Sequence, residues 1–197
     1  MQKEIEAKFL DIDKSEIRSK LQKLNFELLQ SERLMKRKSF HFEDDMKSGR
    51  KRWARVRDEG DKITMTVKEV RVESDINGVY ESEIVIDSFE QGISLFKSLG
   101  MIETAYQETY REEWIKDDVH IAIDTWPHLN PYIEIEALEE SSVRFFSKEL
   151  GFEFEDALFG GVDVVYSKVH NIDRITICKA PLLTFDLSLE EILAKVK

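Results

Sequence analysis

Charged side chains recur at every second position in several stretches of this sequence, and their signs are sorted by stretch. The acidic pairs are Glu4/Glu6, Glu81/Glu83 and Glu134/Glu136, and the basic sets are Arg55/Arg57 and Lys62/Lys68. Residues two apart in an extended strand share one face. Carboxylates gathered on a face can bind hard divalent cations, and arginine and lysine side chains can bind the oxygens of a polyphosphate.

The alternating pattern alone leaves two interpretations open. In one, the charged residues form the wet face of an antiparallel sheet. In the other, a closed antiparallel barrel holds them in its lumen, and the apolar residues between them pack outward against helices. Like charges on one strand face repel each other, so a solvated surface gains little from sorting them by sign. The sorting therefore favours a functional role for the charged face.

The strands that would position these residues are indicated by the alternation of charged and apolar side chains. We expect strands at residues 4–9, 39–43, 51–57, 62–68, 79–86, 109–114, 120–124, 132–137 and 162–166. The glycine-containing polar stretch 44–49 is predicted to be a loop, and Asn77-Gly78 a tight turn.

Helical spacing of apolar residues and capping residues predict four helices. The first is capped by Asp13 and has Ile17, Leu21, Leu24 and Leu28 on its apolar face. The second runs from Ser88 to Gly100 and the third over 142–150. The last is short, with Ser188 and Glu191 in capping-box spacing. Strands and helices together predict an α+β fold.

Composition limits the classes of function. The 197 residues suit one domain, expected to span 1–197, and no linker or low-complexity tract divides them. A net charge of −11 argues against a surface that coats nucleic acid. No apolar run reaches the length of a membrane span, and the start carries no signal-peptide core. The single cysteine, Cys178, fits a reducing cytoplasm, which is the expected location.

The sequence Glu4-Ile5-Glu6-Ala7-Lys8 resembles the Glu-x-Glu-x-Lys signature of the CYTH superfamily, the triphosphate tunnel metalloenzymes. Further matches follow in the order of that family: Arg55-Val56-Arg57, the stretch from Thr64 to Lys68, Glu81-Ser82-Glu83, Arg111, Asp124 and Ile133-Glu134-Ile135-Glu136. The similarity extends from about residue 2 to Tyr166. It implies a closed eight-stranded antiparallel β-barrel, or tunnel, with helices packed outside it.

The resemblance also implies roles for single residues. The groups expected to bind triphosphate oxygens are Lys8, Arg55, Arg57, Lys68 and Arg111, with Lys8 and Arg57 as catalytic groups. The groups expected to hold Mg²⁺ or Mn²⁺ are Glu4, Glu6, Glu81, Glu83, Asp124, Glu134 and Glu136. The implied partner is a small-molecule triphosphate, without nucleic acid or membrane, and a homodimer is left open.

The sequence departs from the family pattern at several places. Thr109 stands where the family usually has a lysine, and His41 where a tyrosine is common. The stretches 127–131 and 164–168 also differ from the usual motifs. Lys62 is expected to be a surface charge, and the three tryptophans are expected to fill the core or the rim.

Three functions remain as hypotheses. The first is metal-dependent hydrolysis of inorganic triphosphate or of a small organic or nucleoside triphosphate. The second is a class IV-type adenylyl cyclase, which converts ATP to cyclic AMP and pyrophosphate and needs an adenine pocket. The third is a non-catalytic module that binds polyphosphate or triphosphates.

Overall fold

The computed structural model describes residues 2–48, 52–70 and 79–196, although side-chain positions are described only from residue 5 and not at 46–48, 70 and 79. The strands in this part of the chain are β1 (Gln2–Phe9), β2 (Glu27–Phe42), β3 (Arg52–Asp58), β4 (Ile63–Val70), β5 (Val79–Ile86), β6 (Met101–Lys116), β7 (Val119–Thr125), β8 (Tyr132–Ala137) and β9 (Leu182–Leu183). The helices are α1 (Lys14–Lys23), α2 (Glu43–Ser48), α3 (Phe89–Ser98), α4 (Glu140–Leu150), α5 (Val162–His170), α6 (Arg174–Cys178) and α7 (Leu189–Ala194), with a 3₁₀ turn at Phe154–Asp156.

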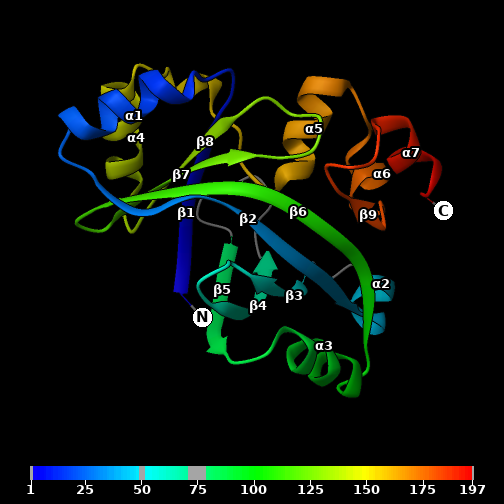
Figure 1. Cartoon of the computed structure of the whole chain (residues 1–197). Coiled ribbons are helices and arrows are strands. Elements are labelled where there is room, and N and C mark those ends of the chain that lie inside the picture. Colours follow the sequence, from blue (N-terminus) through cyan, green and yellow to red (C-terminus); the bar gives the residue numbers. More distant parts are fainter. Residues whose placement is uncertain (1, 49–51, 71–78, 197) are drawn as a thin grey trace.

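The strands form one sheet in the order β2-β3-β4-β5-β1-β8-β7-β6-β9, and β2 also pairs with β6. Each of the strands β1 to β8 therefore has a hydrogen-bonded neighbour on both edges. All pairings are antiparallel except that of the short β9 with β6. The expected α+β class, with an antiparallel sheet, is confirmed. The two long strands β2 and β6 run beside each other across the molecule (Figure 1), with register shifts that bend the pair.

Apolar residues of the strands pack against helices in three clusters. The largest joins Ile5, Ala7 and Phe9 of β1 to α1 and α4, which lie side by side in Figure 1. A second packs α3 against β2, β3 and β4, and a third packs α5, α6, α7 and β9 around residues after β7 and at the start of β8. The helices thus cover the apolar face of the strands, as the alternating pattern requires.

Helix ends follow their capping residues. The Asp13 carboxylate accepts a hydrogen bond from the Glu16 amide at 2.9 Å, and Ser188 and Glu191 complete a capping box. The helix begun at Asp13 is shorter than expected, because Asn25, with φ of 60°, turns the chain into β2. Leu28 therefore lies in β2, half exposed, and its predicted place on the helix was wrong.

Two further expectations were wrong. Residues 162–166, expected as a strand, begin helix α5, because Val165 and Tyr166 bury one helical face in the third cluster and tertiary packing outweighs the strand preference of valine. Residues 43–48, expected largely as loop, form α2, whose first turn is acidic and whose Asp45 carboxylate accepts from Arg52 at 2.7 Å. The predicted turn at Asn77-Gly78 lies outside the described residues.

Candidate functional site

Among the side chains that the structure describes, the charged residues singled out on β1, β3, β4, β5 and β8 alternate with apolar residues that helices cover, so they lie on the opposite face of the sheet. Lys8 is at the centre of one group, with only 2% of its surface exposed. Its Nζ lies 2.6 Å from Oε1 of Glu6 and 3.3 Å from Oε1 of Glu134. Burial alone would lower the pKa of the Lys8 ammonium, but Glu134 and Glu6 outweigh it and raise that pKa above its ordinary value. Lys8 is therefore a permanently charged group inside the protein.

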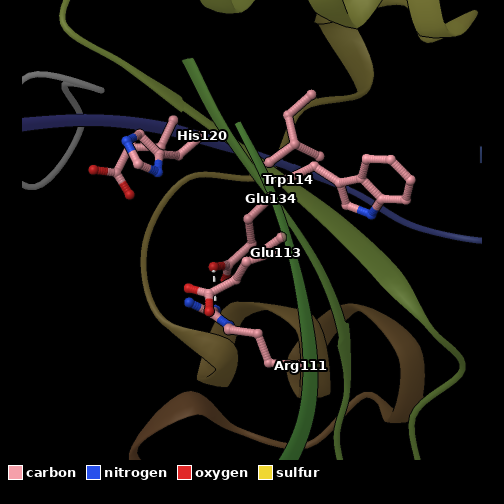
Figure 2. Close-up of a pocket in the computed structure, with 8 residues that line it drawn as sticks. Arg111, Glu113, Trp114, His120 and Glu134 are labelled. Carbon is pink, nitrogen blue, oxygen red and sulfur yellow. Dashed lines mark hydrogen bonds and ion pairs between the residues drawn. The ribbon is translucent and has the colours of Figure 1, made fainter. Parts of the chain in front are cut away.

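Arg111 extends this group to β6 and β7. Its guanidinium donates to both oxygens of Asp124 at 2.7 and 2.6 Å and to Glu134 at 2.6 Å, the contact marked in Figure 2. Burial would raise the pKa of Glu134, but Lys8 and Arg111 hold it well below its usual range. Glu134 is thus an ionised carboxylate that bridges two cations from different strands.

Strands β3, β4 and β5 carry the second group. Nζ of Lys68 lies 2.7 Å from Glu81, and the Arg55 guanidinium lies 3.5 Å from Glu81 and 3.7 Å from Glu83. Burial would raise the pKa of the Glu81 carboxyl, but Lys68 and Arg55 lower it to about 2. Arg57 is 3.8 Å from Glu83. Both basic residues of β3, Arg55 and Arg57, therefore pair with carboxylates of β5.

The two groups influence each other across the sheet. Lys68 on β4 contributes to the low pKa of Glu134 on β8, although β5 and β1 separate these strands in the sheet order. Arg111 on β6 likewise lowers the pKa of Arg57 on β3, after burial and Arg55. Charged side chains of strands that are not neighbours in the sheet order therefore lie near enough to act on each other, and we call this set of buried charged side chains the interior.

Sequence reasoning missed three charged residues of this interior. Glu59, just after β3 and 1% exposed, lies 2.6 Å from Arg57 and also pairs with Arg33 and Lys62. Arg33 donates to the backbone oxygens of Glu59 and Arg111 and forms an ion pair with Glu113. Arg37 is the third. Arg33 and Arg37 are an even number of residues apart in the basic stretch 33–38, so strand periodicity could have placed both on the charged face. Glu59 stands in a turn, where no periodicity indicates the direction of a side chain.

A pocket of about 140 Å³ opens beside Arg111. It is lined by Arg111, Glu113, Trp114, His120, Ile121, Ala122, Glu134 and Glu136 (Figure 2). Glu136 stands opposite Glu6 of β1 and opposite His120 of β7 in the strand registers. The pocket thus joins the acidic pair of β8 to the Arg111 cluster.

The residues expected to hold a metal ion fit a hard divalent cation by donor type, because all are carboxylates. Their side chains are described except for Glu4, whose backbone pairs with Val79. No three metal-binding side chains come together among the described residues. Magnesium needs only one or two carboxylates when phosphate oxygens and waters complete its shell, so the set fits a cation that binds together with a phosphate ligand.

The departures noted in the sequence have structural counterparts. Thr109 is buried, and its hydroxyl donates to the backbone oxygen of Thr125 at 3.0 Å. A neutral hydroxyl therefore stands at the position where a lysine was expected from the family pattern. Burial lowers the pKa of His41, and Asp45 opposes this. Lys62 is about half exposed, as expected, although it pairs with Glu59.

Residues 2–157 of this chain match the model of the CYTH domain family. Similar solved structures include the PH1012 protein of Pyrococcus horikoshii OT3, with a TM-score of 0.65 and 21% identity over 79% of this chain and 94% of that one. A Vibrio parahaemolyticus protein described as a candidate adenylate cyclase has a TM-score of 0.68 and 10% identity over 87% and 99% of the two chains. HpAC1 of Hippeastrum, described as having a dominant triphosphatase activity, has a TM-score of 0.55 and 17% identity over 82% and 91%. No curated protein gives a significant match.

Proposed function

Because the chain belongs to the CYTH domain family, we propose that it hydrolyses a triphosphate, with the help of Mg²⁺ or Mn²⁺, inside a tunnel enclosed by β1 to β8. The observation that carries this proposal is the convergence of buried cations and carboxylates on one face of the sheet. The cations are Lys8, Arg55, Arg57, Lys68 and Arg111. Such a concentration of positive charge in a poorly solvated interior suits a highly charged anion.

The carboxylates act as internal counter-ions until the substrate binds. Buried cations without partners would be very costly, and Glu81, Glu134 and Asp124 satisfy them in the free protein. Triphosphate oxygens offer the same cations an alternative set of acceptors. Binding is therefore an exchange of partners, in which guanidinium groups contact two phosphate oxygens at once.

Lys8 and Arg57 are the groups we assign to catalysis. In hydrolysis, the oxygen of a water molecule attacks the terminal phosphorus, the bond to the bridging oxygen breaks, and orthophosphate and diphosphate leave. Cations held in advance by Glu6, Glu134 and Glu59 stabilise the charge on the transferring group without reorganising. Lys8 and Arg57 would contact that group from β1 and β3.

A divalent cation would be held by carboxylates of β1 and β8, namely Glu4, Glu6, Glu134 and Glu136, with Asp124, Glu81 and Glu83 as further ligands or supports. When bound, it neutralises phosphate charge and orients the attacking water. Glu6 and Glu136 are direct partners in the β1–β8 register, so both carboxylates would be available to hold the cation.

The direct test is a product analysis. The purified protein is incubated with Mg²⁺ or Mn²⁺ and, in turn, with inorganic triphosphate, ATP and thiamine triphosphate. Release of orthophosphate supports the proposal, cyclic AMP with pyrophosphate would replace it with a cyclase, and binding without turnover would replace it with a binding module. Arg57→Ala and Glu6→Gln are expected to abolish turnover with an unchanged circular dichroism spectrum.

The matched control is Arg144→Ala, because Arg144 is a half-exposed arginine of α4 that forms an ion pair with Glu140 of its own helix and lies over the Phe154 ring, away from the charged interior. Its activity is expected to equal that of the wild type. Full activity in Arg57→Ala or Glu6→Gln would exclude the assigned site.

A further inference from the structure

Arg37 of β2 differs from the other cations of the interior. In the described part of the chain, Lys8, Arg55, Arg57, Lys68 and Arg111 each have a carboxylate within 4 Å, whereas Arg37 forms no such ion pair. Its Nε donates to the Gln107 side chain at 2.7 Å, and its guanidinium carbon lies 4.4 Å above the Trp126 ring. Among the described residues, no acceptor forms a hydrogen bond with the terminal nitrogens of this guanidinium, so their N–H groups can bind a ligand.

Two neighbouring polar atoms are also without partners. The indole Nε1 of Trp126 and the hydroxyl of Tyr132 are buried, and neither makes a hydrogen bond to a described residue. Their residues are 3% and 1% exposed. A buried donor without an acceptor costs roughly 1–3 kcal/mol, and such atoms are rare in folded proteins. Arg37 lies above the Trp126 ring, and Tyr132 packs in the same buried cluster as Trp126.

The charges around this point are mainly positive. Burial, followed by the neighbouring cations Arg55, Arg57 and Arg111, lowers the pKa of Arg37 to about 9. The nearby carboxylates, Asp124 and Glu134, are already held by Arg111. An anion bound beside Arg37 would reduce the repulsion among four arginines and accept hydrogen bonds from the unpartnered donors.

Helix α5 covers this end of the interior. Tyr166 of α5 is fully buried in the cluster that contains Trp126 and Tyr132, and its hydroxyl donates to the Pro127 oxygen at 2.5 Å. Arg37 is close enough to Tyr166 to influence its pKa. Since α5 lies beyond residue 157, where the family match ends, part of this end is built by residues outside the matched region.

We propose that Arg37, Trp126 and Tyr132 form a phosphate-group subsite at the end of the interior that α5 covers. The phosphate group is tetrahedral and its oxygens accept hydrogen bonds, so it matches a guanidinium flanked by an indole N–H and a phenolic O–H. It is either one end of the triphosphate or free orthophosphate. The inference rests on the proposed function in that the substrate supplies this group.

The test uses nuclear magnetic resonance of the three indole N–H groups, with Trp126 assigned from its loss in Trp126→Phe. Inorganic triphosphate and orthophosphate are titrated separately into the full-length protein without divalent metal. The Trp126 resonance is expected to move downfield as an acceptor binds. A response to both anions identifies free phosphate as a ligand as well, and a response to triphosphate alone identifies the substrate's end group. If triphosphate saturates the protein and this resonance stays in place, the subsite does not exist.

Affinity and stability of variants give a second readout. Arg37→Met is expected to weaken triphosphate binding about tenfold, or ~1.4 kcal/mol, in calorimetry, whereas the exposed control Arg144→Met leaves it unchanged. Tyr132→Phe removes an unpartnered hydroxyl, so without anion its free energy of unfolding should equal or exceed that of the wild type, while its anion affinity falls. Unchanged binding in Arg37→Met, or a loss of stability in anion-free Tyr132→Phe, would overturn the inference.

The two proposals fail in different ways. A wild type that releases no phosphate from any triphosphate contradicts the proposed function, even if the Trp126 resonance responds to phosphate. A wild type that turns over triphosphate while Arg37→Met binds it equally well contradicts only the subsite.

Discussion

At the residue scale, the interior is held together by carboxylates that each serve more than one cation. Glu134 contacts Lys8 and Arg111, Glu81 contacts Lys68 and Arg55, and Glu59 contacts Arg57 and Arg33. Buried charges need such partners, since removing one leaves the others uncompensated. The same arrangement makes the free protein sensitive to any change in the charge of its carboxylates.

The Lys68–Glu81 pair gives a pH-dependent prediction. The pKa of Glu81 is lowered from 4.5 to about 2, so the pair stabilises the fold fully above pH 4.5 and loses this contribution as the pH falls toward 2. Lys68→Met should therefore lower the free energy of unfolding by roughly 1–3 kcal/mol near pH 6, with a difference that shrinks below pH 4.5. Urea denaturation of both proteins across this range measures it, and a difference independent of pH would contradict it.

Glu59 provides a second prediction at this scale. Glu59→Gln removes the one negative charge that Arg33, Arg57 and Lys62 share at this buried position. We expect a loss of about 3–5 kcal/mol in unfolding free energy, because the buried Arg57 loses its nearest carboxylate and is left with the more distant Glu83 at 3.8 Å. Glu16→Gln is the control: it breaks the exposed Glu16–Lys20 pair and should cost less than about 1 kcal/mol. Equal effects of the two substitutions in thermal or chemical denaturation would refute the expectation.

At the element scale, each strand presents charges to one side and an apolar row to the other, and a helix must cover that row. Helix α3 does this for β2, β3 and β4 with Ile93 and Phe96. Gly92 permits the close approach, because a Cβ there would lie 2.6 Å from the tip of Ile86 and 3.0 Å from Val56. The position of β3, and with it Arg55 and Arg57, therefore depends on α3.

Neighbouring residues of α3 allow a matched comparison. Phe96 is 5% exposed, with its ring centroid 5.3 Å from that of Phe40, whereas Leu95 is half exposed. Phe96→Ala should cost about 3–5 kcal/mol through lost burial and a cavity. Leu95→Ala should change stability by less than about 0.5 kcal/mol. Chemical denaturation distinguishes them, and a small effect of Phe96→Ala would mean that α3 does not anchor these strands.

At the scale of the whole molecule, the segment after the family match completes the fold. Strand β9 pairs with β6, and α5, α6 and α7 bury Trp126, Leu129 and Tyr132. These contacts favour the expectation of a single domain over 1–197, which stays a prediction. In the described part of the chain, each helix is too short or too polar to traverse a lipid bilayer.

Shortening the chain tests this dependence. A protein that ends at residue 160 would expose the apolar residues around Trp126 that α5 to α7 cover. We expect a lower melting temperature and stronger binding of a hydrophobic dye than for the full chain, because buried apolar area is the main source of stability. An unchanged melting temperature would show that the last segment is not part of the cooperative unit.

The sequence by itself determined which side chains share a face. Strand geometry has a period of two, so the spacing of Glu4, Glu6 and Lys8, or of Arg55 and Arg57, already separated charged from apolar residues. It also indicated the antiparallel α+β class and the capping residues that begin α1, α3 and α7, because capping residues act locally. Helix α5 was misassigned because the choice between strand and helix there depends on a distant surface.

Only the tertiary structure decided which charges meet. Glu134 contacts Lys8 and Arg111 because β8 lies beside β1 and β7 in the sheet. Arg37 of β2 lies over Trp126 because the segment after β7 returns to β2, and Tyr132 packs in the same cluster as Trp126. Such partnerships depend on strand order, register and sheet curvature, which are long-range properties. Local periodicity contains no record of them.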